Sequence, residues 1–188
     1  MKLLFASAAI FAALASPALA ADASPVGDWL VKDGYANIRI DICNGKLWGI
    51  VAWEQKPGGV DVENPDPAKK TRPLLGSPVL MGLAPGGPGK WSGEIYNSQN
   101  GKMYSANVTV PDENTLDLEG CLFTNFMCLT QKWTRVKTPP AGAPPLPPIK
   151  GAAPAPAKQA QKKGTAAGPS DTCLRVADEV IPAPAAKK

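Results

Sequence analysis

Apolar and polar residues alternate through residues 24–137, with the two-residue period of a β-strand. Residues 35–42 place three isoleucines on one face, and residues 103–110 alternate in the same way. Turn-forming pairs, Asp33-Gly34 and Asn100-Gly101 among them, lie between such runs, as hairpin turns do. The pattern predicts strands near 26–32, 35–42, 47–54, 76–81, 90–97, 102–110, 115–121 and 127–136.

Eight short strands joined in sequence predict an all-β domain over residues 24–137. An antiparallel up-and-down barrel is favoured because a closed sheet leaves no exposed strand edge. A β-sandwich is the alternative. A barrel of this strand count holds one small ligand or is filled by its own side chains. One long connection, residues 55–75, interrupts the regular spacing.

Residues 1–20 have the pattern of a secretory signal peptide. Lys2 precedes an apolar run over residues 3–14, and Ala18-Leu19-Ala20 provides the small-residue cleavage signal. The run is short of the roughly 20 residues that span a bilayer. We therefore expect an exported protein, periplasmic or secreted, without a transmembrane segment after processing.

Residues 138–188 form a tail rich in proline, alanine and lysine, a composition that favours extended, disordered chain. Within it, residues 171–181 either form a short helix capped by Ser170 or Asp171, or stay disordered. The net charge is +4, and its surplus lies in this tail, because the body is nearly neutral. Nucleic acid is not an expected partner, since such binders carry their charge on a folded face.

The chain contains no histidine, which excludes Ser-His-Asp and Cys-His catalysis and every histidine-ligated metal site. Glu54, Glu94 and Glu119 lie on predicted strands, and a glycosidase would need two of them at a set separation. Acids on exposed strand faces more often serve solubility. We expect no catalytic residues and no cofactor.

The polar cluster of the long loop comprises Asp61, Glu63, Asn64 and Asp66. One interpretation is an oxygen-ligand site for a hard cation. The favoured interpretation is a rigid loop, because bases follow at Lys69, Lys70 and Arg72 and the spacing differs from a calcium loop. We therefore predict no metal site.

Four aromatic residues, Trp53, Trp91, Tyr96 and Tyr104, lie on predicted strands. On one face they would line a ligand cavity. They would equally serve as filling for the barrel interior. We take them as candidate ligand-binding residues.

The triplet Gly27-Asp28-Trp29 on the first strand, with Arg135 on the last, resembles the arrangement of the lipocalin-like superfamily. There the tryptophan closes one barrel end and the arginine packs over its ring. Glycine permits close backbone approach, and a guanidinium over an indole gains about 0.5–2 kcal/mol. We expect structural roles for Gly27, Trp29 and Arg135.

Several longer motifs follow in order: G-D-W-L-V-K-D-G from Gly27, D-V-E-N-P-D-P-A-K-K-T-R-P-L-L-G from Asp61, and W-S-G-E-I-Y-N-S-Q-N-G-K from Trp91. This series is similar to the bacterial exported family named domain of unknown function 2147. The resemblance covers residues 26–137 and none of the tail. It implies an exported lipocalin-like barrel with no established activity.

Many members of that family carry a second cysteine where Trp48 stands here, so Cys43 lacks a nearby partner. Cys121 and Cys128 flank a predicted hairpin loop, where a bridge is geometrically easy. We expect that disulfide in an exported protein, and a second one from Cys43 to Cys173. Without a neighbouring histidine the cysteines have no predicted catalytic or zinc role.

Three functions remain as hypotheses. The preferred one is a periplasmic binding module that takes a small, largely apolar ligand through the barrel end opposite Trp29. The second is a scaffold whose basic tail contacts an anionic envelope surface. The third is a hydrolase that uses scattered carboxylates.

Overall fold

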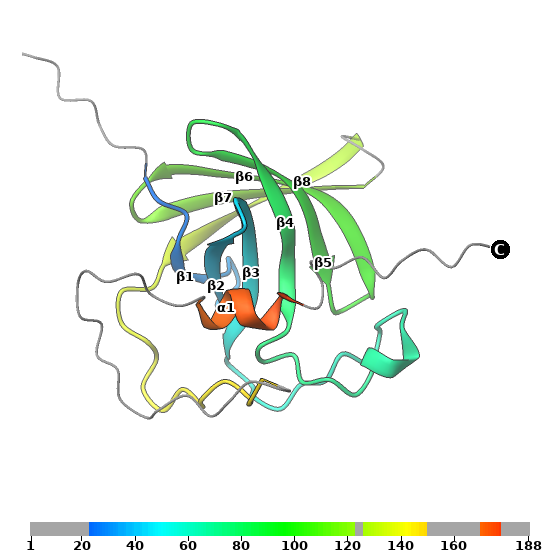
Figure 1. Ribbon diagram of the computed structural model, residues 1–188. Coiled ribbons are helices and arrows are strands. Elements are labelled where there is room, and N and C mark those ends of the chain that lie inside the picture. Colours follow the sequence, from blue (N-terminus) through cyan, green and yellow to red (C-terminus); the bar gives the residue numbers. More distant parts are fainter. Residues whose placement is uncertain (1–22, 123–125, 150–169, 178–188) are drawn as a thin grey trace, which may run out of the picture.

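The computed structural model describes residues 23–122, 126–149 and 170–177, whose eight strands close into one antiparallel barrel (Figure 1). The strands are β1 (Gly27–Leu30), β2 (Ala36–Cys43), β3 (Lys46–Glu54), β4 (Pro78–Gly87), β5 (Lys90–Asn97), β6 (Lys102–Asp112), β7 (Thr115–Leu122) and β8 (Phe126–Arg135). Each strand pairs with its successor, and β1 pairs with β8. The predicted all-β, antiparallel up-and-down barrel is confirmed, and the sandwich alternative is wrong.

The alternation of apolar residues sets which side chains enter the barrel. On β2, Ile38 and Ile40 are buried in the interior, whereas Ile42 near the strand end is half exposed. On β7, Leu116 and Leu118 are buried in the same core. Antiparallel pairing of such strands gathers their apolar faces into a single interior.

Strand β4 is longer than predicted. The expectation was residues 76–81, but the strand runs from Pro78 to Gly87. The register shifts between Met81 and Ala84, where Gly82 adopts a φ of +58° that glycine tolerates. The irregular stretch therefore continues as a bulged strand, although its glycines and prolines resemble a turn in the sequence.

The two ends of the barrel differ in their connections, because turns alternate between ends in an up-and-down sheet. The turns after β2, β4 and β6 lie at the end where the chain enters. The turns after β1, β3 and β5 lie at the other, together with the last residues of β7 and the first of β8, and we call it the open end (Figure 1). The long connection after β3 belongs to the open end and contains the 3-10 helix η1 (Pro67–Lys69).

Both predicted disulfides are present, Cys121–Cys128 within the β7–β8 hairpin and Cys43–Cys173 between β2 and the tail. The second attaches helix α1 (Asp171–Arg175) to the outer face of β2 and β3 (Figure 1). The Ser170 hydroxyl accepts a hydrogen bond from the Cys173 backbone N–H, so Ser170 is the cap of the two residues that the sequence offered. The remainder of the predicted helix, from residue 178, lies outside the described residues.

A second apolar cluster lies outside the barrel under this part of the tail. Trp48 and Ile50 of β3 pack there with Cys43 and with Val176, which is fully buried. Leu146, from the proline-rich segment, packs against the same cluster. These tail residues are thus ordered against the barrel, which the composition did not predict.

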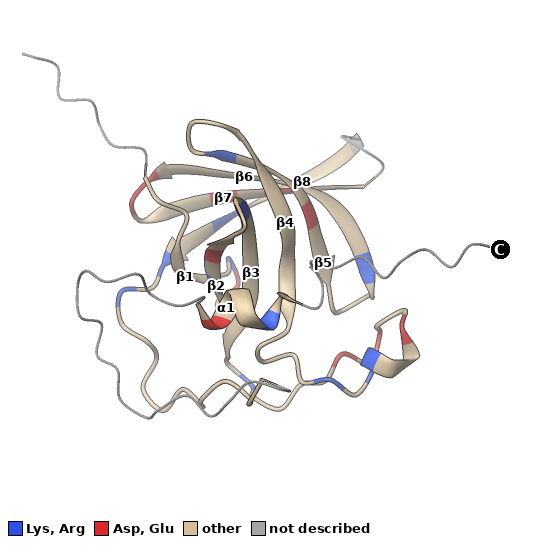
Figure 2. Ribbon diagram, viewed as in Figure 1, with Lys and Arg blue, Asp and Glu red and all other residues tan. Residues whose placement is uncertain are grey.

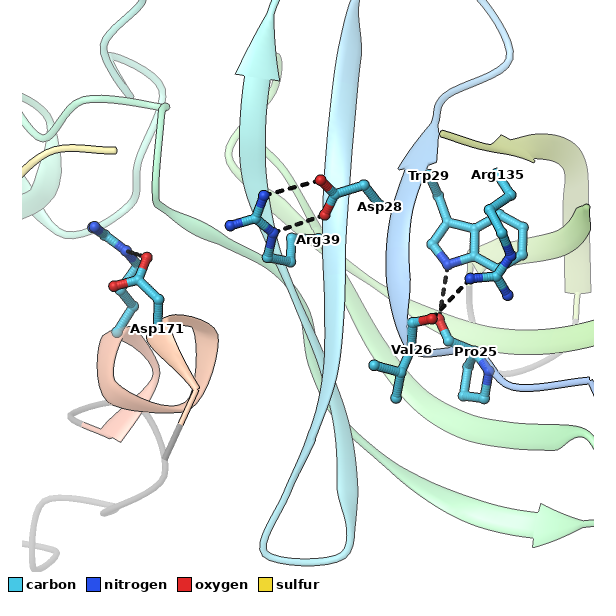
Figure 3. Close-up of polar contacts among 8 residues, drawn as sticks. Pro25, Val26, Asp28, Trp29, Arg39, Arg135 and Asp171 are labelled. Atoms are coloured by element: carbon cyan, nitrogen blue, oxygen red, sulfur yellow. Dashed lines mark hydrogen bonds and ion pairs between the residues drawn. The ribbon is translucent and has the colours of Figure 1, made fainter. Parts of the chain in front are cut away.

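Acidic and basic residues are interspersed along the barrel strands and the β3–β4 connection (Figure 2). One ordered pair joins β1 to β2, where Asp28 accepts from Arg39 at 2.7 and 2.9 Å (Figure 3). Within the part of the chain that is described, no helix has the length and apolar character to cross a membrane.

Candidate functional site

A cavity of about 650 Å³ occupies the half of the barrel toward the open end. Its walls include Ile38, Val51, Ile95, Leu118 and Trp133, which belong to the interior core or pack against it. Its rim comes from open-end turns and the strand ends beside them, namely Asp33, Tyr35, Gln55, Lys56, Asn97, Ser98, Gln99 and Met127. The cavity therefore has apolar walls and a largely polar mouth.

The opposite half of the barrel is filled by side chains. Trp29, Ile40, Leu47, Val108 and Leu116 are all fully buried there, and none of them lines the cavity. The interior is thus divided into a packed half and a hollow half. The sequence pattern left both a filled and an empty interior open.

Trp29 closes the packed end. The Arg135 guanidinium carbon lies 4.1 Å from the centroid of its ring, and the Trp29 indole N–H donates to the Pro25 carbonyl at 2.7 Å (Figure 3). Arg135 also donates to the carbonyls of Val26 and Glu113. The expected cation–π contact is therefore present.

Gly27 makes room for that arginine. A Cβ placed on Gly27 would lie 2.6 Å from Arg135 Nη1, and the residue has a φ of +134°. Both facts require glycine at this position.

The β3–β4 connection forms one side of the cavity mouth and is organised by Asp61, which is fully buried. The Asp61 carboxylate accepts from the Tyr96 hydroxyl at 2.7 Å, the Asn64 amide at 2.7 Å and Arg72 at 3.0 Å. Asp66 caps η1 through the Ala68 backbone N–H. These are the contacts that the rigid-loop interpretation predicts.

Tyr96 of β5 links the barrel to the β3–β4 connection through its hydrogen bond to Asp61. Burial and the hydrogen bond to Asp61 raise the pKa of the Tyr96 hydroxyl to about 12. The guanidinium carbon of Arg72 also lies 5.8 Å from its ring centroid. On the next turn, a Cβ at Gly101 would overlap the Glu63 carbonyl, so the loop rests directly on the β5–β6 hairpin.

Of the four candidate aromatic residues, Tyr96 and Tyr104 line the cavity, whereas Trp53 and Trp91 do not. Trp91 packs against the interior core away from the cavity. Two aromatic lining residues were not anticipated, Tyr35 at the rim and Trp133 in the wall. The sequence signal for Trp133 was its position two residues before Arg135, because residues two apart on a strand lie on the same face.

Trp53 is displaced by a β-bulge. Ile38 pairs with Val51, but Asn37 pairs with Trp53 and Ala36 pairs with Glu54, so Ala52 is an extra residue in β3. Paired residues share one face of a sheet, and Ala36 faces the interior. The bulge therefore directs Glu54 into the cavity and Trp53 away from it.

The three carboxylates considered for catalysis are not brought together. Glu54 lines the cavity, whereas Glu94 and Glu119 neighbour inward-facing residues on their strands and so point outward. Glu119 accepts from the Asn107 side chain at 3.0 Å. Burial raises the pKa of the Glu54 carboxyl, and a hydrogen bond from the Gly58 backbone N–H lowers it to a smaller extent.

Glu119, Cys121 and Cys128 lie close enough to resemble a metal-ligand group. The two cysteines are joined to each other in the disulfide, so they offer no thiolate.

Comparisons with known proteins agree with this architecture. The fold is similar to that of protein HP1028 from Helicobacter pylori, a lipocalin-family protein, with a TM-score of 0.58 and 20% sequence identity over 61% of this chain and 84% of that chain. No curated protein matches the chain. The family model described as "Uncharacterized protein conserved in bacteria (DUF2147)" matches residues 27–135, from the first residue of β1 to the last of β8. The chain belongs to this bacterial family, DUF2147.

Proposed function

We propose that the protein binds a small, largely apolar molecule in the cavity at the open end of its barrel. The observation that carries the proposal is the cavity itself, about 650 Å³ with apolar walls. Sites for small molecules usually measure about 300–1,000 Å³ and combine such walls with a few polar groups. The proposed role is binding and not catalysis.

The distribution of packing supports this role. Trp29 and its neighbours fill one half of the interior, so this chain packs large side chains tightly where the barrel is closed. In the hollow half, by contrast, Gly120 of β7 faces the cavity, and a Cβ placed there would meet no atom within 4 Å. A hollow lined by small and apolar residues is typical of barrels that hold a ligand.

We also propose that binding takes place outside the cytoplasm, in the periplasm. The leader pattern of residues 1–20 supports export, although those residues lie outside the described part of the chain. Two disulfides support an oxidising compartment, because such bonds are rare in the cytosol.

The role of the basic tail as an envelope contact gains no support from the described residues. Its described segments pack on the barrel through Leu146 and Val176. All the lysines of the tail belong to residues 150–169 and 178–188, which lie outside the described part of the chain.

The test is displacement of a neutral apolar fluorophore, N-phenyl-1-naphthylamine, combined with native mass spectrometry of the protein from its own periplasm. Gly120→Phe places a ring in the cavity and should abolish fluorophore binding. Gly86→Phe is the matched control, because Gly86 is exposed, lies in β4 away from the cavity, and has no atom closer than 3.7 Å to an added Cβ. Absence of binding by the native protein, or equal binding by both variants, would overturn the proposal.

A further inference from the structure

One residue of the cavity wall has a covered polar atom without a partner. Among the described residues, three buried side-chain oxygens lack a hydrogen bond: Asn37 Oδ1, Glu54 Oε2 and Thr172 Oγ1. Glu54 is the residue of these three that lines the cavity. Buried polar groups are nearly always hydrogen-bonded, so an exception inside a binding cavity points to a donor on the ligand.

The position of Glu54 is built by the backbone. The bulge at Ala52 directs the residue inward, opposite Ala36. Strict alternation along β3 would have put Trp53 in its place, which would have made a more apolar cavity. Bulges occur preferentially beside functional sites, where they redirect a side chain.

The other carboxylate oxygen is held by the start of the β3–β4 connection. The Gly58 backbone N–H donates to the carboxylate. A Cβ on Gly59 would lie 3.2 Å from Glu54 Oε1 and 3.0 Å from Leu74 Cδ1, so the chain passes directly over the group. This contact fixes one oxygen and leaves Oε2 without a donor.

The cavity's charges favour a donor of positive sign. Its charged lining residues are Asp33, Glu54 and Lys56; Asp33 and Lys56 are both exposed at the rim, so Glu54 is the charged group of the wall itself. Glu54 is partly buried and one of its oxygens lacks a hydrogen bond, and a cationic donor offsets that cost best because it brings both a hydrogen bond and an opposite charge.

We propose that the ligand is an amphiphile with a protonated amine head, which pairs with the Glu54 carboxylate once that side chain turns its covered Oε2 toward the cavity, while the apolar body fills the cavity. This inference rests on the proposed binding function and names the ligand class for the same site. The raised pKa of the Glu54 carboxyl is consistent with it, because burial disfavours the charge that a cationic head would stabilise.

The experiment compares octylamine, 1-octanol and octanoate as competitors of N-phenyl-1-naphthylamine near pH 7. The three share one apolar chain and differ in the head. We expect octylamine to bind at least about tenfold more tightly than octanoate. The ammonium of octylamine gains a charge-assisted hydrogen bond with Glu54, whereas the carboxylate of octanoate is repelled by it. Glu54→Gln should remove most of that difference. Glu94→Gln, an exposed acid on the outer face, should leave it unchanged.

The outcomes separate the two proposals. If the native protein binds the fluorophore but octanoate competes as well as octylamine, the amine inference fails and the binding function stands. An unchanged ratio in Glu54→Gln has the same consequence. If Lys56 selects the head, octanoate binds most tightly, which also overturns the inference. If the fluorophore does not bind at all, both proposals fail.

Discussion

The guanidinium of Arg135 on the last strand lies over the indole of Trp29 on the first, 4.1 Å from the ring centroid. The contact spans the β1–β8 junction, where the barrel closes. It also explains the triplet at the start of the barrel. Gly27 gives the arginine room, Asp28 pairs with Arg39 on the outer face, and Trp29 fills the interior.

Trp29→Ala should lower the free energy of unfolding by about 3–5 kcal/mol, as truncation of a fully buried aromatic does. Denaturant unfolding followed by circular dichroism measures the loss. Trp53→Ala is the matched control and should cost less, because Trp53 is only partly buried and lies outside the cavity. Equal losses would contradict the role of Trp29 as the plug of the barrel.

Gly27→Ala should destabilise the protein by about 1–3 kcal/mol through backbone strain, with a further loss if Arg135 is displaced. The reason is the φ of +134° and the 2.6 Å approach of Arg135 Nη1 to an added Cβ. Gly86→Ala, which meets nothing closer than 3.7 Å, should be close to neutral in the same thermal melt. A neutral Gly27→Ala would show that the barrel closure does not depend on this approach.

Tyr96→Phe should cost about 1–3 kcal/mol, because it removes a donor from the fully buried Asp61 carboxylate. Hydrogen exchange should rise in residues 55–75, which this contact holds. In the native protein the Tyr96 hydroxyl, with its pKa of about 12, should titrate near that pH in ultraviolet absorbance. Since the folded state holds this proton more tightly than the unfolded state, stability should fall as pH rises from about 10 to 12. Titration near pH 10 would contradict the buried hydrogen bond.

The two disulfides should differ in their contribution to stability. Cys43 and Cys173 are separated by 130 positions, and Cys121 and Cys128 by 7. Loop-closure entropy predicts losses of about 5 kcal/mol for the Cys43→Ser/Cys173→Ser variant and about 2 kcal/mol for Cys121→Ser/Cys128→Ser. Chemical denaturation compares them, and the first variant should also lose exchange protection in α1. Equal losses would contradict the loop-closure account, and unchanged exchange protection would mean that α1 stays docked without its bond.

Glu54→Gln should stabilise the protein at neutral pH when no ligand is added. The folded state raises the pKa of this carboxyl above its ordinary value of 4.5 and so binds the proton more strongly than the unfolded state. Stability from Glu54 is therefore complete below that value and decreases as pH rises through the folded-state pKa. The variant lacks this decrease. The other titratable lining groups are common to both proteins: Asp33, Tyr35, Lys56, Tyr96 and Tyr104. Thermal melts from pH 3 to 8 should converge at the acidic end; parallel curves would contradict the burial of Glu54.

The strands and their hairpin order could be predicted from local sequence, whereas the end plugged by Trp29 and Arg135 was what the resemblance to the lipocalin-like arrangement implied. Alternation and turn pairs are properties of short stretches of sequence, and a short turn between two strands predicts that those two strands pair with each other. Ser170 as a helix cap and Cys121 opposite Cys128 are local in the same sense. The end of β4 could not be placed, because a bulge at Gly82 and a turn have the same glycine-rich composition.

The sequence by itself determined the period of the strands and their order along the chain; it favoured a barrel over a sandwich, and its resemblance to the lipocalin-like arrangement implied the meeting of Trp29 with Arg135. Only the tertiary structure decided that Glu54 and not Trp53 faces the cavity, that half the interior is hollow, and that α1 covers Trp48. The physical reason is that one extra residue in a strand reverses the faces of all that follow it. Likewise, the space left inside a barrel depends on side chains from all its strands at once, which no single segment specifies.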